Sequence, residues 1–273
     1  MSEAGTPAEA LTYEQAIANL RQTADTGDRY YAAWWLGRFR MKQPEAIALL
    51  IEALDDSLDR APDGGYPLRR NAARALGKLE SPEAIAPLIA CLQCEDYYVR
   101  EAATQSLGEL QATVAVPALL KLLEGGPEAI AAIPGKPHLT QPADAVMETL
   151  GQLRATVAVP VVQAFLEHPI DKIRLAAARS LYQLTGDDHY AERVVQGLSD
   201  PKLQRRRSAL MDLGAIGYLP AAPQIAQTLA ENSLKLISLK GLLDTHLRQQ
   251  TPEAIAELDE SAIALMDLMD GLL

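Results

Sequence analysis

The sequence predicts an all-α protein, a right-handed α-solenoid in which helical hairpins stack one on the next. Of the 273 residues, 48% are hydrophobic and only 5% are aromatic, and Ala, Leu and Ile dominate, which favours packed helices over sheets. The other two observations are an internal repeat and, within each repeat, apolar residues at helical spacing. We expect a single domain over residues 1–273.

The repeat is clearest in three segments with the same layout. They are LGKLESPEAIAPLIACL from Leu76, LGELQATVAVPALLKLL from Leu107 and LGQLRATVAVPVVQAFL from Leu150. We call the first leucine the anchor, and anchors recur at Leu36, Leu76, Leu107, Leu150, Leu181 and Leu213. Four residues earlier stand Ala32, Ala72, Ala103, Val146, Ala177 and Ala209, and seven residues earlier stand Arg29, Arg69, Arg100, Ala143, Arg174 and Arg206. Six units agree at three positions, which composition alone does not explain.

Each unit is predicted to form two helices joined by a turn. The first helix carries small residues where a neighbouring backbone comes close, and the second has apolar residues at helical spacing, such as Ile85, Leu88 and Leu92. One hairpin cannot cover its own apolar face, whereas stacked hairpins bury a continuous core, so we expect repeats of the HEAT kind. The segments before Ala24 and after Lys235 depart from the pattern and are expected to cap the ends.

Two insertions interrupt the repeat, at about residues 55–68 and 124–143. The first contains Pro62-Asp-Gly-Gly, which predicts a turn because Pro starts the bend and Gly accepts a positive φ. The second has four prolines in about twenty residues. Segments of this length between ordered helices are either functional or mobile.

Aromatic residues are gathered in the N-terminal third of the chain. Eight of them, including both tryptophans, lie between Tyr30 and Tyr98. The residues at i, i+3, i+4 and i+7 of one predicted helix are Tyr31, Trp34, Trp35 and Arg38, which predicts a common face. Tyr66 and Tyr97 both stand ten residues before an anchor and are expected to project in parallel.

Two interpretations of this cluster stay open at this point. In one, the rings form an aromatic core with solvated arginines around it. In the other, rings and guanidinium groups form a surface for a partner protein or a large planar ligand with carboxylates. The arginine that recurs seven residues before the anchor is expected to bind carbonyls or an acidic neighbour and to join hairpins, so Arg38 and Arg70, which lie off this series, are the better ligand candidates.

Composition and motifs argue against several other functions. A net charge of −11 argues against binding to nucleic acid or an anionic membrane, and no apolar run is long enough to cross a bilayer. The first residues lack a basic segment followed by an apolar run, so we expect no signal peptide and a cytoplasmic protein. Cys91 and Cys94 stand in an apolar helix and are expected to be structural thiols. No metal-ligand spacing is present, and of the four histidines only His138 is a candidate acid or base.

Three segments resemble the E subunit of the heterodimeric E/F-type phycobilin lyases. They are YYAAWWLGRFR from Tyr30, PDGGYPLRRNAARALGKL from Pro62 and DYYVREAA from Asp96. The resemblance, closest to the phycocyanin α-subunit phycocyanobilin lyases, implies a partner, the related F subunit, with which the chain attaches phycocyanobilin through a thioether to a cysteine of apo-phycocyanin α and can also remove or transfer it. It implies cyanobacterial cytoplasm or a plastid stroma, with the bilin as substrate and no separate cofactor. The E subunit of a phycoerythrocyanin lyase-isomerase and a non-catalytic HEAT scaffold are the alternatives.

The residues and the resemblance together predict a bilin site. A bilin is a flat tetrapyrrole with two propionates, so guanidinium groups can bind the propionates and rings can stack on the pyrroles. The predicted bilin-binding residues are Tyr31, Trp34, Trp35, Arg38, Tyr66, Arg70 and Tyr97. Asp63 or Asp96 is expected to accept hydrogen bonds from the pyrrole N–H groups, and with His138 they are the candidate acid–base residues. Because the acceptor protein supplies its own thiolate, we expect the lyase to act by positioning the chromophore.

Overall fold

The computed structural model describes residues 11–250 and 258–273, and within these ranges the regular structure is α-helix with short 3-10 turns. One isolated antiparallel bridge, between Ala132 and Leu139, lies in the second insertion. The helices divide between two units, Met1–Leu153 and Arg154–Leu273. The all-α repeat architecture predicted from the sequence is confirmed.

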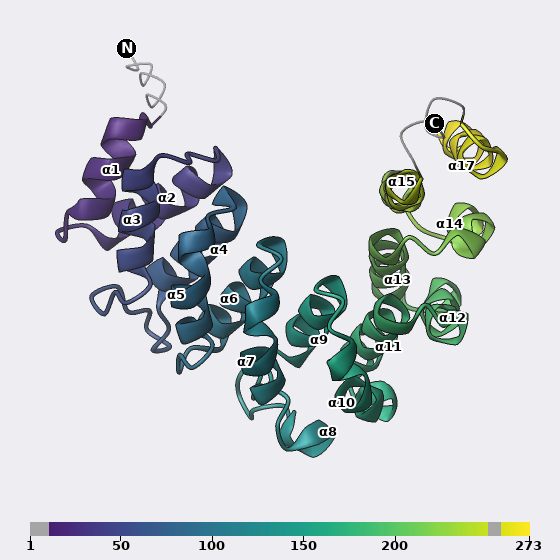
Figure 1. The fold of residues 1–273 in the computed structure, drawn as a ribbon, viewed down its shortest axis with the longest axis horizontal. Helices are drawn as coiled ribbons and strands as arrows, with labels where there is room; N and C mark the ends of the chain where they lie inside the picture. Colours follow the sequence, from purple (N-terminus) through teal and green to yellow (C-terminus); the bar gives the residue numbers. More distant parts are fainter. Residues whose placement is uncertain (1–10, 251–257) are drawn as a thin grey trace, which may run out of the picture. The chain divides into compact units, whose positions relative to one another are not determined.

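Unit 1 (Met1–Leu153) has two layers of helices (Figure 1). The first layer consists of α2 (Thr26–Arg38), α4 (Pro67–Leu79), α6 (Tyr97–Glu109) and α9 (Ala143–Gln152). The second layer consists of α3 (Pro44–Ala53), α5 (Ile85–Cys91) and α7 (Val116–Lys121). At the N-terminal end α1 (Tyr13–Arg21) packs on α2 and α3, and the short α8 (Gly126–Ala129) begins the second insertion.

Unit 2 (Arg154–Leu273) repeats this arrangement. Its first layer consists of α11 (Asp171–Thr185), α13 (Leu203–Ile216) and α15 (Asn232–Gln249). Its second layer consists of α10 (Val159–Gln163), α12 (Asp188–Val195) and α14 (Ala222–Gln227). The last helix, α17 (Glu260–Asp270), packs on α14 and α15. Among the described residues, no helix is long and apolar enough to cross a bilayer.

The anchor leucines form the centre of the core in both units. All six are completely buried, and so are the small residues four positions earlier, from Ala32 to Ala209. A small residue at this position lets the first-layer helices approach closely. The same reason explains the glycine after the anchor, since a Cβ added to Gly37 would lie 2.7 Å from the Cα of Ala75 on the next helix.

The recurring arginines bind main-chain carbonyls, as predicted. Arg69 Nε donates to Asp56 O at 2.6 Å, Arg174 Nη1 to His168 O at 2.7 Å and Arg206 Nη1 to Asp200 O at 2.6 Å. Arg29 donates to Leu20 O at 3.4 Å and also pairs with Asp56 at 2.6 Å. These bonds join the starts of α2, α4, α11 and α13 to the end of a neighbouring segment, which fixes hairpins relative to one another within each unit.

A second set of buried hydrogen bonds joins neighbouring helices of the first layer. Ser106 Oγ donates to Ala73 O at 2.8 Å, and Thr149 Oγ1 donates to Thr104 O at 3.1 Å. Ser238 of α15 makes the same contact with Leu210 O of α13 at 2.6 Å. The first layer therefore continues through α15, which contains Lys235, and the capping role of the segment after Lys235 stays a prediction. The expected cap at the N-terminal end is formed, within the described residues, by α1.

Candidate functional site

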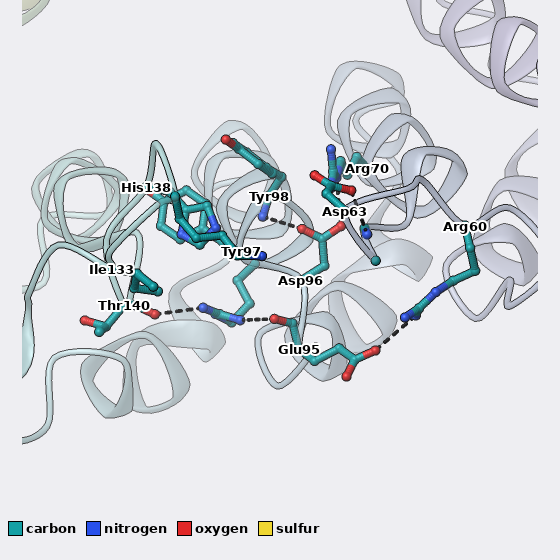
Figure 2. Close-up of a pocket in the computed structure, with 14 residues that line it drawn as sticks. Arg60, Asp63, Arg70, Glu95, Asp96, Tyr97, Tyr98, Ile133, His138 and Thr140 are labelled. Atoms are coloured by element: carbon teal, nitrogen blue, oxygen red, sulfur yellow. Dashed lines mark hydrogen bonds and ion pairs between the residues drawn. The ribbon is translucent and has the colours of Figure 1, made fainter.

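The two insertions meet at one cavity of about 470 Å³ in unit 1. It lies at the N-terminal ends of α4 and α6, and the rest of the layer there is regular repeat structure. The first insertion and α4 contribute Arg60, Asp63, Gly64, Gly65 and Arg70, the start of α6 contributes Glu95, Asp96, Tyr97, Tyr98 and Arg100, and the second insertion contributes Ile133, Lys136, His138 and Thr140 (Figure 2). A volume of this size is within the usual range of small-molecule sites.

Asp96 and Arg70 form the buried ion pair of the cavity wall. The Asp96 carboxylate accepts from Arg70 Nε at 2.8 Å, from the Tyr66 amide at 2.7 Å and from the Tyr98 amide at 2.8 Å. Burial disfavours the charged carboxylate, but these three hydrogen bonds and the Arg70 charge outweigh it and lower the Asp96 pKa. Asp96 therefore caps α6 as an ionised acceptor at neutral pH, and its role as an acid or base stays a prediction.

Three rings stand together on the other side of Asp96. The His138 ring stacks on Tyr97 with centroids 4.5 Å apart and planes at 15°, and the ring of Tyr98 meets His138 edge-on at 5.5 Å. The Arg70 guanidinium lies over the Tyr98 ring at 4.5 Å. Tyr97 is buried, and this burial raises the pKa of its hydroxyl. The arrangement is a wall of flat, polarisable groups with cations beside it.

The second insertion reaches the cavity as a small hairpin over residues 131–140, which we call the Pro-rich hairpin. Its base is closed by a hydrogen bond from Thr140 N to Ala131 O at 2.9 Å. At its tip Lys136 N donates to Ile133 O at 3.0 Å, and Gly135 has φ +75°, which Gly accepts without strain. Four side chains of this hairpin line the cavity, those of Ile133, Lys136, His138 and Thr140.

Arg100 fastens this hairpin to α6. Its guanidinium donates to Cys94 O at 2.7 Å and Glu95 O at 3.0 Å on one side, and to Thr140 O and the Gln141 side chain, both at 2.9 Å, on the other. Burial lowers the pKa of the Arg100 guanidinium. The four acceptors satisfy the hydrogen-bond donors of the buried group. An arginine of the regular repeat series thus also shapes the cavity.

Tyr66 does not face the cavity. The guanidinium carbons of Arg60 and Arg69 each lie 4.0 Å from the centroid of its ring, and its hydroxyl donates to Glu95 Oε1 at 2.7 Å. These contacts fasten the first insertion to the start of α6. Tyr66 and Tyr97 therefore have different surroundings, since the Tyr66 ring contacts two guanidinium groups and the Tyr97 ring is stacked on His138.

The four residues predicted to share a face of α2 are divided by the structure. Tyr31 and Trp34 are 48% and 42% exposed and stack on each other with centroids 5.4 Å apart, and Arg38 is exposed one turn further along. Trp35 is only 8% exposed and contacts Phe39, with centroids 4.9 Å apart. The expectation that Trp35 belongs to the exposed face is wrong, since it packs into the core. None of these four residues lines the cavity.

The remaining candidates behave as single side chains. Asp63 is exposed at the cavity rim, where its Oδ1 accepts from the Gly65 amide at 3.0 Å. Cys91 is buried, which raises its thiol pKa to about 12 and agrees with the predicted structural role of this thiol, and Cys94 is half-buried. Within residues 11–250 and 258–273 no cluster of three or more His, Cys, Asp or Glu could hold a metal ion.

Sequence reasoning missed several residues of the cavity. They are Arg60, Glu95, Tyr98, Ile133, Lys136 and Thr140. Tyr98 stood in the aromatic cluster but had no repeat position to single it out. The others lie in or beside the insertions, and the available signal was that both insertions interrupt the same run of repeats.

Comparison with known proteins identifies the class and then the family. Residues 58–133 match the family model of HEAT repeats, and residues 28–56 match the PBS lyase HEAT-like repeat. The chain is thus a HEAT-repeat protein of the phycobilisome lyase class. Phycocyanobilin lyase subunit alpha of Picosynechococcus sp. is 57% identical over 97% of this chain and 98% of the relative. This chain belongs to the phycocyanobilin lyase alpha-subunit family.

Two further relatives place the chain more closely. The complex of CpcE and CpcF of phycocyanin lyase from Nostoc sp. PCC7120 contains a chain that matches with a TM-score of 0.89 and 52% identity, covering 100% of both chains. The bilin biosynthesis protein PecE of Mastigocladus laminosus is more distant, at 41% identity over 87% of this chain and 83% of the relative. The sequence identities therefore favour the phycocyanobilin lyase over the PecE alternative.

Proposed function

We propose that this chain is the alpha subunit of a heterodimeric phycocyanobilin lyase. With an F-type partner it attaches phycocyanobilin to a cysteine of apo-phycocyanin α and can remove or transfer it, in the cytoplasm of a cyanobacterium or the stroma of a plastid. Membership of the family and the match to a chain of the CpcE–CpcF complex support the activity and the partner. The bilin is the substrate, and no separate cofactor is part of the proposal.

We place the bilin in the cavity between the two insertions. The single observation that carries this assignment is that both departures from the repeat meet there, around an aromatic wall of Tyr97, Tyr98 and His138 with cations beside it. Flat pyrroles can stack on such a wall, and carboxylates can pair with the cations. Asp63, exposed at the rim, is the carboxylate available to accept hydrogen bonds from pyrrole N–H groups.

The reaction needs positioning more than it needs a catalytic triad. The thiol of the acceptor adds across the ethylidene double bond of ring A, so that sulfur bonds to the exocyclic carbon and the proton ends on the adjacent ring carbon, without an oxidant or reductant. A site that holds the bilin in one orientation lowers the entropic cost of this addition. His138, whose Nδ1 lies 2.9 Å from Leu139 O, is the proposed acid or base within the cavity.

It stays a prediction that the exposed residues Tyr31, Trp34 and Arg38 extend the bilin-binding surface. A stacked, solvent-exposed aromatic pair suits either a bilin ring or a partner protein. Trp34→Ala separates these uses, because loss of bilin binding supports the first and loss of partner association with normal bilin binding supports the second. We do not include Trp35 and Tyr66 among the proposed bilin contacts. Trp35 packs in the core, and the Tyr66 ring already contacts two guanidinium groups.

The test is reconstitution of the purified chain with its F-type partner, phycocyanobilin and apo-phycocyanin α. The covalent product is followed by its absorbance and by zinc-induced fluorescence after denaturing electrophoresis. Tyr98→Leu keeps the main-chain amide that caps Asp96 but removes the ring, and the loss of about 1 kcal/mol of stacking predicts a transfer rate about fivefold lower. Tyr190→Leu in α12, outside the cavity, is the matched control.

Two results would contradict the proposal. If no adduct forms with the unaltered chain, the chain is a scaffold and not a lyase subunit. If Tyr98→Leu and Tyr190→Leu both transfer at the normal rate, the cavity is not where the chromophore is held.

A further inference from the structure

Four cations line the cavity, and three of them already have partners within the chain. Arg100 donates to four acceptors around the base of the Pro-rich hairpin. Arg70 pairs with Asp96 at 2.8 Å, and Arg60 pairs with Glu95 at 3.0 Å. A substrate carboxylate that bound any of these arginines would have to share or displace an acceptor that the fold already uses.

The fourth cation, Lys136, differs from the others. No ion pair or side-chain hydrogen bond joins it to another residue in the part of the chain that the structure describes, although its side chain lines the cavity. It can pair with an incoming carboxylate without breaking any internal contact. Its flexible four-carbon side chain also lets the ammonium group reach carboxylates in different positions.

The hairpin holds Lys136 at a defined place. The turn at its tip is closed by the bond from Lys136 N to Ile133 O, with Gly135 supplying the positive φ, and Arg100 fixes the base through Thr140 O. Two residues along, His138 is stacked on Tyr97. The cation and the aromatic wall therefore lie on the same short segment, which matches a ligand that is flat and carries a carboxylate on a short arm.

We infer that Lys136 binds a propionate of the bilin and that the Pro-rich hairpin sets the orientation of the chromophore in the cavity. This inference rests on the proposed function. Lys136 is a positioning residue, because an ion pair to a propionate fixes which edge of the tetrapyrrole faces the hairpin while the reacting ethylidene group remains elsewhere. The alternative is that the Lys136 side chain, at the tip of the Pro-rich hairpin, is solvated and binds no ligand.

The proposed ion pair between Lys136 and a propionate can be tested by altering the substrate and the protein together. The complex of the full chain with its F-type partner is titrated with phycocyanobilin and with its dimethyl ester, in which both propionates are neutral, and binding is followed by the change in bilin absorbance. Lys136→Gln removes the charge, and Lys136→Arg keeps it. Lys121→Gln, an exposed lysine of α7 outside the cavity, is the matched control.

The expected result is a loss of discrimination between acid and ester. A partly exposed ion pair contributes about 1 kcal/mol, so Lys136→Gln should weaken binding of the free acid about fivefold and leave the ester almost unchanged. Lys136→Arg should restore the preference for the acid, and Lys121→Gln should retain it. The preference should also shrink as salt is added, since the pair is near solvent.

Two outcomes would overturn the inference, and they are distinct. If Lys136→Gln prefers the acid over the ester as strongly as the unaltered complex does, another cation binds the propionate and the role of Lys136 is refuted while the proposed function stands. If the unaltered complex binds neither the acid nor the ester, the proposed bilin site itself fails, and the role of Lys136 falls with it.

Discussion

At the scale of the residue, Asp96 shows how one side chain can serve both fold and site. Its carboxylate caps α6, holds the start of α4 through the Tyr66 amide and fixes Arg70 beside Tyr98. Each contact is a hydrogen bond to a buried anion, which is stronger than one between neutral groups. Removing the charge would leave Arg70 without its partner inside the cavity wall.

Asp96→Asn should therefore destabilise unit 1 by about 2 kcal/mol at pH 7. The pKa of Asp96 is lowered in the folded state, so its contribution is complete above the unfolded value near pH 3.9 and is lost as pH falls through the lower folded value. The difference in unfolding free energy between the variant and the unaltered chain should shrink over that range. Urea unfolding read by tryptophan fluorescence reports on unit 1, because both tryptophans lie in α2.

The control for this prediction is Asp63→Asn. Asp63 is exposed and accepts one hydrogen bond from the Gly65 amide, so a change below about 0.5 kcal/mol is expected at either pH. An Asp96→Asn penalty of equal size at pH 7 and pH 3 would mean that the charge of Asp96 contributes nothing.

Single residues were predictable from the sequence where the repeat fixes their position. The arginines seven residues before the anchors bind carbonyls because five of the six repeats place the same donor beside the end of a helix. Trp35 and Tyr66 were misplaced for a different reason. The i, i+4 rule puts Trp35 near Tyr31 but does not say where the exposed face ends, and nothing in the sequence indicates that two guanidinium groups cover Tyr66.

At the scale of the element, the Pro-rich hairpin depends on a residue outside it. Arg100 of α6 supplies two hydrogen bonds to Thr140 O and Gln141, and the hairpin has one internal bridge of its own, between Ala132 and Leu139. A bond to a charged donor contributes about 1.5–3 kcal/mol. The order of the hairpin is therefore set by α6 as much as by its two prolines, Pro134 and Pro137.

Arg100→Met keeps the length of the side chain but removes all of its donors. We expect the amide of Thr140, which bonds to Ala131 O, to exchange with solvent at least about tenfold faster, because 1.4 kcal/mol corresponds to a factor of ten. Hydrogen exchange measured on peptides that cover residues 131–140 checks this. Arg74→Met is the control, since Arg74 makes only a 4.0 Å pair with Glu101 and is half exposed. Equal exchange in the two variants would show that Arg100 does not hold the hairpin.

The elements show where sequence patterns stop being informative. Helices and turns followed from apolar spacing, Pro and Gly, and the insertions were located as departures from the repeat. Four helix ends carry a non-glycine residue with positive φ, at Arg40, Glu80, Gln111 and Arg154. Gly is the residue that usually marks such an end, so these were not predictable. The convergence of the two insertions was also hidden, because it requires the stacking geometry of α4 and α6.

At the scale of the whole molecule, the fold is a set of contacts between neighbouring repeats. The anchor leucines are all buried, and a serine or threonine side chain bonds α6 to α4, α9 to α6 and α15 to α13. Such a fold was predictable because the same pattern of anchor leucine and preceding small residue recurs along the chain. Its energetics should be local, since each hairpin contacts mainly its neighbours.

Gly37→Ala tests this locality. A Cβ at Gly37 would lie 2.7 Å from the Cα and 2.8 Å from the Cβ of Ala75. Relieving this clash requires a shift of the α4 backbone, because Ala75 has no flexible side chain that could move aside. Overpacking of this kind costs about 1–3 kcal/mol, which exceeds the gain of about 1 kcal/mol from replacing Gly by Ala in a helix. We expect lower urea stability of unit 1 and faster amide exchange in α2 and α4, with exchange in α13 and α15 unchanged.

Gly271→Ala is the matched control for that variant. Gly271 has φ −65°, and the nearest atom to an added Cβ would be Asp267 O at 3.6 Å, so ordinary packing is retained and stability should stay within about 0.5 kcal/mol. If Gly37→Ala accelerated exchange equally in α2 and in α15, the repeats would unfold as one cooperative block. The nearest-neighbour description of the energetics would then be wrong.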